Sequence, residues 1–257
     1  MTPAERAEAL RRLHSDPELL VLVNVWDVIS ATIVADLPGC TAIATASHAI
    51  AVSHGYPDGE QIPLDLMLTS IKRIAAAVEL PVSADLEAGY GDPGTTVRRA
   101  IAAGAVGGNL EDAMRPLGES VAAVAAAVAA GEAEGVPFVL NARTDAFLSA
   151  GDRDPQQVLA DAIGRGRAFL AAGADCVFVP GRLDAATVAR LVEGIGHRKL
   201  SVIGGPGTLP QSELAAMGVA RLSYGPWAQR IALTALADTG AELLAGGALP
   251  ANVRGLT

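Results

Sequence analysis

A regular alternation of short apolar runs with longer helix-like segments constrains the fold of this chain more than any other feature. The apolar runs predict eight strands, at Leu20–Val25, Ala42–Thr45, Val82–Asp85, Gly107–Leu110, Phe138–Arg143, Cys176–Val179, Leu200–Ile203 and Arg221–Ser223. Segments with helical spacing of apolar residues predict one helix after each strand, at Val28–Ala35, Leu64–Val78, Thr95–Ala103, Val121–Glu134, Pro155–Ala172, Ala185–Glu193, Gln211–Met217 and Ala228–Leu244.

Near-continuous apolar strands that alternate with helices are typical of a parallel sheet covered by helices. Eight such units in 257 residues match the size of a (β/α)8 barrel, or TIM barrel. We therefore predict an α/β barrel that forms a single domain over residues 1–257. Its first element is a helix in the charged, amphipathic segment Met1–Asp16. A doubly wound open sheet is the alternative, but it would lack the eighth unit.

Composition limits the partners and the location of this chain. Hydrophobic residues make up 51% of the sequence, enough for a sizeable core, and the net charge of −9 argues against binding to nucleic acid or to an anionic membrane. Two cysteines, Cys40 and Cys176, cannot build a disulfide framework, and no apolar run approaches a membrane span. These features predict a cytoplasmic protein without nucleic-acid or membrane partners.

Two carboxylates lie at the end of the third predicted strand. In the stretch Pro81–Gly91, Asp85 and Glu87 are two positions apart, and alternate residues of a strand point to the same side of a sheet. Carboxylates held that close repel each other unless one is protonated or a cation lies between them. A divalent metal with oxygen ligands meets this need. The alternative is one solvated carboxylate and one that caps a loop.

Catalytic groups of such barrels lie where the strands end at their carboxyl termini. Polar residues lie there at the ends of all of the first five strands: Asn24, Asp27, Thr45, Ser47, His48, Asp85, Glu87, Asn109, Glu111, Asp112, Asn141, Arg143, Thr144 and Asp145. The long connection after the second strand adds His54, Tyr56 and Asp58. Several acidic groups and one arginine on one rim favour a hard cation together with an anionic ligand.

Arg143 would suit a carboxylate or phosphate ligand, because its planar guanidinium forms paired hydrogen bonds. The alternative is an internal salt bridge to Glu111 or Asp145. The loop Gly204–Thr208 follows the seventh strand, where barrels often bind phosphate through backbone amides, although such a loop is equally well a tight turn.

Lysine content excludes one type of carbonyl chemistry. The two lysines, Lys72 and Lys199, fall inside a helix and before the seventh strand, so neither reaches the carboxyl rim to form a Schiff base. A carbonyl substrate would then have to be polarised by a metal. Nucleotide-cofactor motifs such as GxGxxG after a strand are absent from the sequence.

Taken together, these residues resemble the isocitrate lyase/phosphoenolpyruvate mutase superfamily over Leu20 to Trp227. The stretches that carry the resemblance are Asn24–Asp27, Ala44–Ser47, Gly55–Asp58, Ala84–Gly91, Asn109–Asp112, Asn141–Asp145 and Gly225–Trp227. Jointly they are highly specific, and each is weak alone. The resemblance implies a (β/α)8 barrel, chemistry through an enolate of pyruvate or a related 2-oxo acid, and Mg²⁺, with Mn²⁺ as the alternative.

Residue roles follow from this resemblance together with the positions of the residues. The expected metal ligands, direct or through water, are Asp85, Glu87, Asp58 and Glu111. The expected substrate-binding residues are Thr45, Ser47, His48, Asp85, Arg143, Gly205 and Thr208. The expected catalytic residues are Arg143, Glu111, His48 and Tyr56, with His54 as a further substitute for a missing acid.

Several departures from the superfamily concern the residues that select the reaction. Lyases of the superfamily carry a cysteine as general acid on a mobile loop after the fourth strand, and phosphonomutases carry a Lys-x-Asn stretch there. Here Ala113–Glu119 has neither, and the loop is short. In addition, Glu87 stands where an aspartate is usual, and Pro180 where better-known members have histidine or glutamate.

Three functions remain open on the sequence. The first is a Mg²⁺-dependent carbon–carbon lyase or decarboxylase that acts on a small 2-oxo or 2-hydroxy dicarboxylate. The second is phosphonopyruvate-type chemistry, and the third is a protein that binds metal and a 2-oxo acid with little turnover. Members of the superfamily commonly exchange their last helix between subunits, so Ala228–Leu244 predicts a homo-oligomer, a dimer or tetramer.

Overall fold

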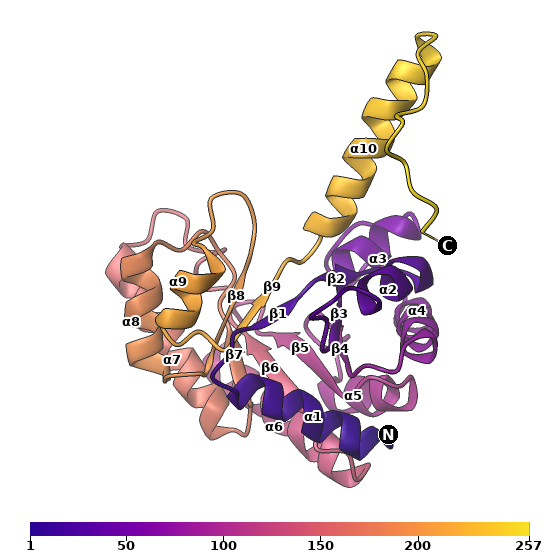
Figure 1. The fold of residues 1–257 in the computed structure, drawn as a ribbon. Coiled ribbons are helices and arrows are strands. Elements are labelled where there is room, and N and C mark those ends of the chain that lie inside the picture. The colour runs from indigo at the N-terminus through magenta and orange to yellow at the C-terminus, as the bar shows by residue number, and fades with distance from the viewer. Residues whose placement is uncertain (257) are drawn as a thin grey trace.

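The computed structural model describes residues 1–256 and shows a barrel of parallel strands surrounded by helices (Figure 1). The strands are β1 (Leu20–Leu22), β2 (Asn24–Val25), β3 (Ile43–Thr45), β4 (Val82–Asp85), β5 (Gly107–Glu111), β6 (Val139–Arg143), β7 (Cys176–Phe178), β8 (Leu200–Ile203) and β9 (Arg221–Ser223). They form one sheet in the order β1-β9-β8-β7-β6-β5-β4-β3-β2. Because β1 and β2 are two parts of the first predicted strand, and β1 pairs with β9 while β2 pairs with β3, the sheet nearly closes on itself. The predicted barrel is confirmed.

Helices follow the strands as the alternation predicts. They are α1 (Pro3–Ser15), α2 (Val28–Ala35), α3 (Ser47–Ser53), α4 (Leu64–Ala77), α5 (Pro93–Ala102), α6 (Leu117–Ala133), α7 (Pro155–Ala171), α8 (Ala185–Ile195), α9 (Gln211–Ala216) and α10 (Trp227–Leu244). Two differences from the prediction bear on the site. Helix α3 was not predicted, and α6 begins at Leu117 rather than at Val121.

The start of α3 depends on a residue that is distant in the sequence. Ala46 precedes the helix and offers no side chain to cap it. Instead, Asp85 at the end of β4 accepts a hydrogen bond from the Ser47 backbone N–H at 3.0 Å. A carboxylate in this position satisfies an amide of the first turn and interacts favourably with the helix dipole. No capping residue precedes Ser47 in the sequence, because the capping carboxylate comes from another strand.

Helix α1 covers the amino-terminal end of the barrel (Figure 1). Its apolar residues Ala7 and Leu10 are fully buried in a cluster with residues of β1, β3 and β6, among them Val139. The contact is close: a Cβ on Gly107 of β5 would lie 2.7 Å from the Leu10 side chain and 2.7 Å from the Val139 carbonyl oxygen. This end of the barrel is therefore filled by packing, and the opposite end remains open to a site.

His14 makes the packing of α1 sensitive to acid. Its side chain is buried, and Nδ1 lies 2.9 Å from the Leu10 carbonyl oxygen. Burial, with the nearby charge of Arg221, lowers the pKa of His14 to about 3. The unfolded chain takes up a proton below about pH 6.5 and the folded chain does not, so stability decreases as the pH falls through this range.

We therefore expect His14 to remove about 2 kcal/mol of unfolding free energy between pH 7 and pH 5. Chemical denaturation of the wild type and of His14→Gln at both pH values measures this contribution. The pH dependence should be weaker in the variant, and an equal dependence in both proteins would contradict the assignment.

Helix α10 extends away from the barrel (Figure 1). Gln229 is its one buried residue, whereas Ile231, Leu236 and Leu244 are 69%, 68% and 93% exposed. The predicted exposed apolar face is therefore present. No helix within residues 1–256, α10 included, combines the length and apolar character needed to cross a membrane.

Candidate active site

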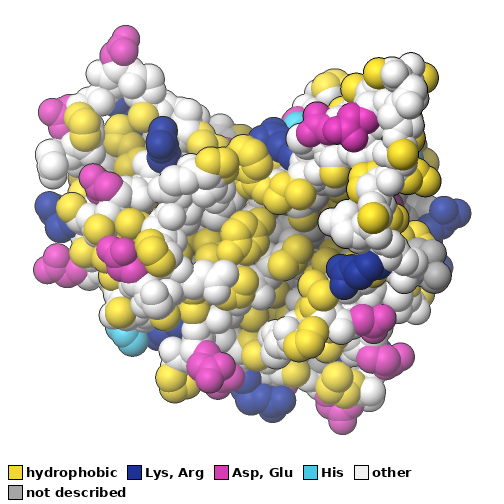
Figure 2. All heavy atoms as spheres, turned by 45° about the horizontal axis from the view of Figure 1, so that its top comes forward, with side chains coloured by type: hydrophobic (Ala, Val, Ile, Leu, Met, Phe, Trp, Pro, Cys, Tyr) yellow, Lys and Arg dark blue, Asp and Glu magenta, His cyan; other side chains and the backbone are white. Residues whose placement is uncertain are grey.

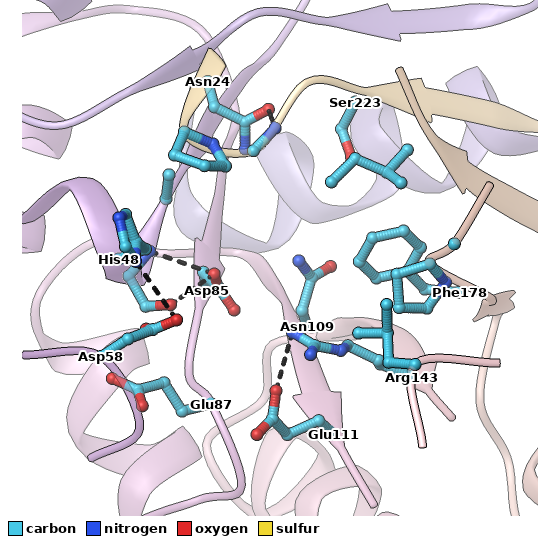
Figure 3. Close-up of a pocket in the computed structure, with 18 of the residues that line it drawn as sticks. Asn24, His48, Asp58, Asp85, Glu87, Asn109, Glu111, Arg143, Phe178 and Ser223 are labelled. Carbon is cyan, nitrogen blue, oxygen red and sulfur yellow. Dashed lines mark hydrogen bonds and ion pairs between the residues drawn. The ribbon is translucent and has the colours of Figure 1, made fainter. Parts of the chain in front are cut away.

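A cavity of about 520 Å³ opens where the strands end at their carboxyl termini (Figures 2 and 3). Figure 2 shows this side of the molecule as a hollow with hydrophobic side chains inside and charged side chains along its margin. Four carboxylates and three guanidinium groups line the cavity, from Asp58, Asp85, Glu87, Glu111, Arg143, Arg182 and Arg230. The predicted convergence of charged residues at this rim is therefore present.

Asp85 links the ends of β3 and β4 by hydrogen bonds. Its Oδ2 accepts hydrogen bonds from the Ser47 N–H at 3.0 Å and from the Ser47 hydroxyl at 2.7 Å, and its own N–H donates to Thr45 Oγ1 at 2.9 Å. The hydroxyl and the backbone N–H of Ser47, a residue predicted to bind substrate, are thus both engaged by Asp85. Thr45 is 1% exposed, so it acts on the site only through Asp85.

Glu87 also lines the cavity, but the strand-alternation argument for it was wrong. Strand β4 ends at Asp85, and Glu87 has a φ of 51°, in the left-handed region. Its carboxylate accepts hydrogen bonds from the Tyr90 hydroxyl at 3.0 Å and from the Glu60 backbone N–H. Burial raises the pKa of Glu87, and the charges of Asp85 and Asp58 add to the rise. These contacts, rather than a strand, hold Glu87 in the cavity wall.

Arg143 lies between two carboxylates at the end of β6. Nη1 is 2.7 Å from Glu111 Oε2 (Figure 3), and Nε is 2.6 Å from Asp145 Oδ1. The internal salt bridge considered as an alternative is therefore present to both partners. Burial raises the pKa of Glu111 to about 8 against the opposing effect of Arg143, and Asp145 and Asp85 contribute by repulsion. Two largely buried carboxylates thus share one guanidinium group.

His48 and Asp58 form a pair on the wall that α3 builds. His48 Nδ1 lies 3.2 Å from Asp58 Oδ2, and both residues line the cavity (Figure 3). Of the three proposed substitutes for the missing acid, His48 is the one that lines the cavity. His54 instead contacts Ser70 of α4 at 3.0 Å, and Tyr56 packs against the hydrophobic core.

Gly205 and Thr208 lie outside the lining of this cavity. The Gly205 N–H, which was predicted to bind an anion, donates to Thr208 Oγ1 at 2.8 Å. The loop therefore satisfies this amide internally, as expected of the tight turn that was the alternative.

The connection between β5 and α6 is short and fixed. It spans residues 112–116, because α6 begins at Leu117. Asp112 is 2% exposed and accepts hydrogen bonds from Arg165 Nη1 at 3.1 Å and from the Met114 and Asp145 N–H groups. These contacts hold the segment in place, whereas the resemblance implies a mobile loop at this position in lyases of the superfamily.

Several residues that line the cavity were not among the predicted site residues. Asn24, Asn109, Phe178, Ser223, Arg182 and Arg230 are among them. Asn24 joins the ends of the barrel: Oδ1 accepts from the Tyr224 N–H at 2.7 Å, and Nδ2 donates to the Thr45 carbonyl oxygen at 2.8 Å. Arg182 follows β7 and Arg230 follows β9, so a survey of residues after every strand, including the later ones, would have found both.

The donor chemistry of the cavity fits a hard divalent cation. Among the residues described by the structure, no three acidic, histidine or cysteine side chains form a ready-made ligand cluster. Mg²⁺ does not need one, because it commonly binds one or two carboxylates and retains several waters. The pKa values of Glu87 and Glu111 are raised, first by burial and in part by repulsion from Asp85. A bound cation would reduce this repulsion and favour the ionised carboxylates.

The fold and cavity define a barrel enzyme with an acidic site at the carboxyl face. The family model described as phosphoenolpyruvate phosphomutase matches residues 10–244, and the chain belongs to this family. It is thus an enzyme of the isocitrate lyase/phosphoenolpyruvate mutase superfamily, whose members include lyases and mutases, and the predicted resemblance is confirmed.

Sequence and structural relatives agree with this assignment. An oxaloacetate decarboxylase of Bradyrhizobium sp. (strain BTAi1) is 31% identical over all of this chain and 91% of its own length. A Burkholderia cenocepacia J2315 protein, described provisionally as a phosphonomutase, has a TM-score of 0.87 and 39% identity over 95% of this chain and 100% of its own. Oxaloacetate acetylhydrolase has a TM-score of 0.85 and 28% identity over 96% of this chain and 90% of its own.

Proposed function

We propose that this protein is a Mg²⁺-dependent lyase or decarboxylase that forms a pyruvate-like enolate from a small 2-oxo or 2-hydroxy dicarboxylate. The observation that carries the proposal is one cavity in which Asp85, Arg143 and the His48–Asp58 pair face each other at the carboxyl end of the barrel. Relatives that act on oxaloacetate support it, as two of the proteins compared above are an oxaloacetate decarboxylase and an oxaloacetate acetylhydrolase.

Asp85 is the proposed anchor for Mg²⁺, or for Mn²⁺ as the alternative. Glu87, Asp58 and Glu111 line the same cavity and would contribute directly or through water. When bound, the cation would withdraw electrons from the substrate carbonyl and stabilise the negative charge of the enolate.

Arg143 and His48 have separate roles in the proposed reaction. Arg143 binds the carboxylate of the 2-oxo acid, with Glu111 and Asp145 fixing the plane of its guanidinium. In a decarboxylation, the bond between C3 and the departing carboxylate breaks, its electron pair enters the enolate, and CO₂ leaves. His48, oriented through Nδ1 by Asp58, then donates a proton to C3 and pyruvate forms.

Phosphonopyruvate-type chemistry is the second proposed function. Its support is the similarity to the Burkholderia protein described provisionally as a phosphonomutase. Against it, the segment of residues 112–116 carries neither the lysine nor the asparagine expected of phosphonomutases. A protein that binds metal and a 2-oxo acid with little turnover is the remaining alternative.

A substrate panel with Mg²⁺ distinguishes these functions. Oxaloacetate, 2-methylisocitrate, isocitrate and phosphonopyruvate would each be incubated with the enzyme, and the products followed by enzyme-coupled assay and NMR. Pyruvate or another 2-oxo acid from a carbon substrate supports the first function, and phosphoenolpyruvate from phosphonopyruvate supports the second. Binding of pyruvate without turnover of any substrate would contradict both.

For the first function we expect His48→Gln to lower kcat roughly a hundredfold to ten-thousandfold, the usual range for loss of a general acid. KM should change little, because Arg143 and the metal remain. His54→Gln is the matched control, since His54 contacts Ser70 outside the cavity. Steady-state kinetics of the two variants decide the point: equal activities would exclude His48 as the proton donor.

We also propose that the protein forms a homo-oligomer through α10 and resides in the cytoplasm. The exposed residues Ile231, Leu236 and Leu244 lie on one projecting helix and would be covered by a second copy of the chain. Light scattering at micromolar concentration should give at least the mass of a dimer, and Leu236→Glu should lower it. A wild-type monomer would contradict the proposal.

A further inference from the structure

A dicarboxylate substrate brings two negative groups into a cavity that is already acidic. Of the three cavity arginines, Arg143 is compensated by Glu111 and Asp145. Arg182 and Arg230 differ from it: within residues 1–256, neither side chain takes part in an ion pair or in a hydrogen bond. Both side chains are exposed, so neither needs a partner within the protein, and both remain available to an anion that enters the cavity.

The two arginines come from neighbouring parts of the barrel. Arg182 lies in the connection between β7 and α8, and Arg230 in the first turn of α10, which follows β9. Strand β8 lies between β7 and β9 in the sheet, so the loop after β8 separates the two arginines along the rim. This loop is the glycine-rich segment Gly204–Gly207.

Glycines of that loop lie next to Arg182 and next to Trp227, on which Arg230 stacks. A Cβ on Gly207 would lie 3.1 Å from Arg182 Nη2, so the absence of a side chain leaves room for the guanidinium. A Cβ on Gly205 would lie 2.8 Å from Nε1 of Trp227, and the Arg230 guanidinium stacks 4.9 Å from the centre of the Trp227 ring. The loop therefore leaves room for the Arg182 guanidinium and for the Trp227 ring on which Arg230 stacks.

We propose that Arg182 and Arg230, on either side of the loop Gly204–Gly207, form a second anion-binding subsite for the negative group of the substrate distal to the 2-oxo acid. This inference rests on the proposed function and adds the source of substrate selectivity. Guanidinium groups bind carboxylates and phosphonates with similar geometry, so the shared chemistry is a distal oxyanion. Arg143 and the metal site would hold the 2-oxo acid, and apolar Phe178 and Pro180 line the same cavity.

Binding measurements on arginine variants test the subsite. Titration calorimetry with Mg²⁺ would compare 3,3-difluorooxaloacetate and phosphonopyruvate, which carry a distal anion, with pyruvate, which lacks one. We expect Arg182→Gln and Arg230→Gln each to weaken binding of at least one distal-anion ligand tenfold to a hundredfold, as for a lost charge-assisted hydrogen bond. Pyruvate affinity should stay within about twofold, and the ligand with the larger loss identifies carboxylate or phosphonate as the distal group.

Two further variants make the result specific. Arg190→Gln on α8 removes one exposed positive charge outside the cavity and should leave all affinities unchanged. Arg182→Lys keeps the charge and should recover part of the lost affinity. Equal losses for pyruvate and the distal-anion ligands, or no loss for the latter, would overturn the subsite. Because calorimetry needs no turnover, an inactive wild type that still shows the selective loss would refute the proposed reaction and leave the subsite standing.

Discussion

Replacing Asp85 by asparagine is expected to lower metal-dependent kcat/KM on the order of a thousandfold or more, while the fold persists. Asparagine has the shape of aspartate and retains an oxygen that can accept the hydrogen bonds of Ser47, but it lacks the charge that anchors the cation. Steady-state kinetics over a range of Mg²⁺ concentrations measure the loss. Asp152→Asn, a change at an exposed position outside the cavity, is the control.

Thermal unfolding separates a metal anchor from a structural cap at this position. Added Mg²⁺ should raise the melting temperature of the wild type and of Asp152→Asn, because a ligand that binds the folded state stabilises it by mass action. The shift should vanish in Asp85→Asn, whose unfolding free energy without metal should lie within about 1 kcal/mol of the wild type. A wild type that Mg²⁺ does not stabilise, together with a destabilised variant, would show that Asp85 only caps α3.

Arg143→Gln is expected to have the second largest effect, on catalysis and stability together. The substrate carboxylate would lose its partner, so we expect kcat/KM to fall about a hundredfold to a thousandfold, mainly through KM. Glu111 and Asp145, which are largely buried, would also lose their ion-pair partner. Since the pKa of Glu111 is already raised to about 8, it can become neutral, which limits the loss of unfolding free energy to roughly 1–3 kcal/mol.

Arg143→Lys is the matched comparison for this prediction. Lysine keeps the positive charge but cannot form two parallel hydrogen bonds with a carboxylate. We expect the stability of this variant to be close to that of the wild type, with KM still raised. Denaturant unfolding and kinetics of the three proteins provide the data, and a wild-type KM in Arg143→Gln would remove Arg143 from substrate binding.

The barrel itself was predictable because its pattern is local. Each apolar run and each helical repeat lies within about 20 residues, and the boundaries of β4, β8, β9 and α2 agree with the prediction to the residue. The ends of parallel strands meet at one rim in any such barrel, so Asp85, Glu111 and Arg143 could be placed together without coordinates. The superfamily followed from the residues at these strand ends.

Contacts between distant segments decided the rest. The Asp85 carboxylate caps helix α3 from β4, and the same contact engages Ser47, which was predicted to bind substrate. Glu87 reaches the cavity through a left-handed turn held by Tyr90 and Glu60, which no strand periodicity encodes.

The glycine-rich loop shows the same limit for function. Its sequence is compatible with phosphate binding and with a tight turn, and only the structure shows its Gly205 amide bonded to Thr208. The space next to Gly207 is occupied by Arg182, about 25 residues earlier in the chain, and the space next to Gly205 by Trp227, about 20 residues later. Periodicity determines where a chain lies in the barrel, because it reflects burial of one face, whereas hydrogen-bond partners and steric space are properties of the packed structure.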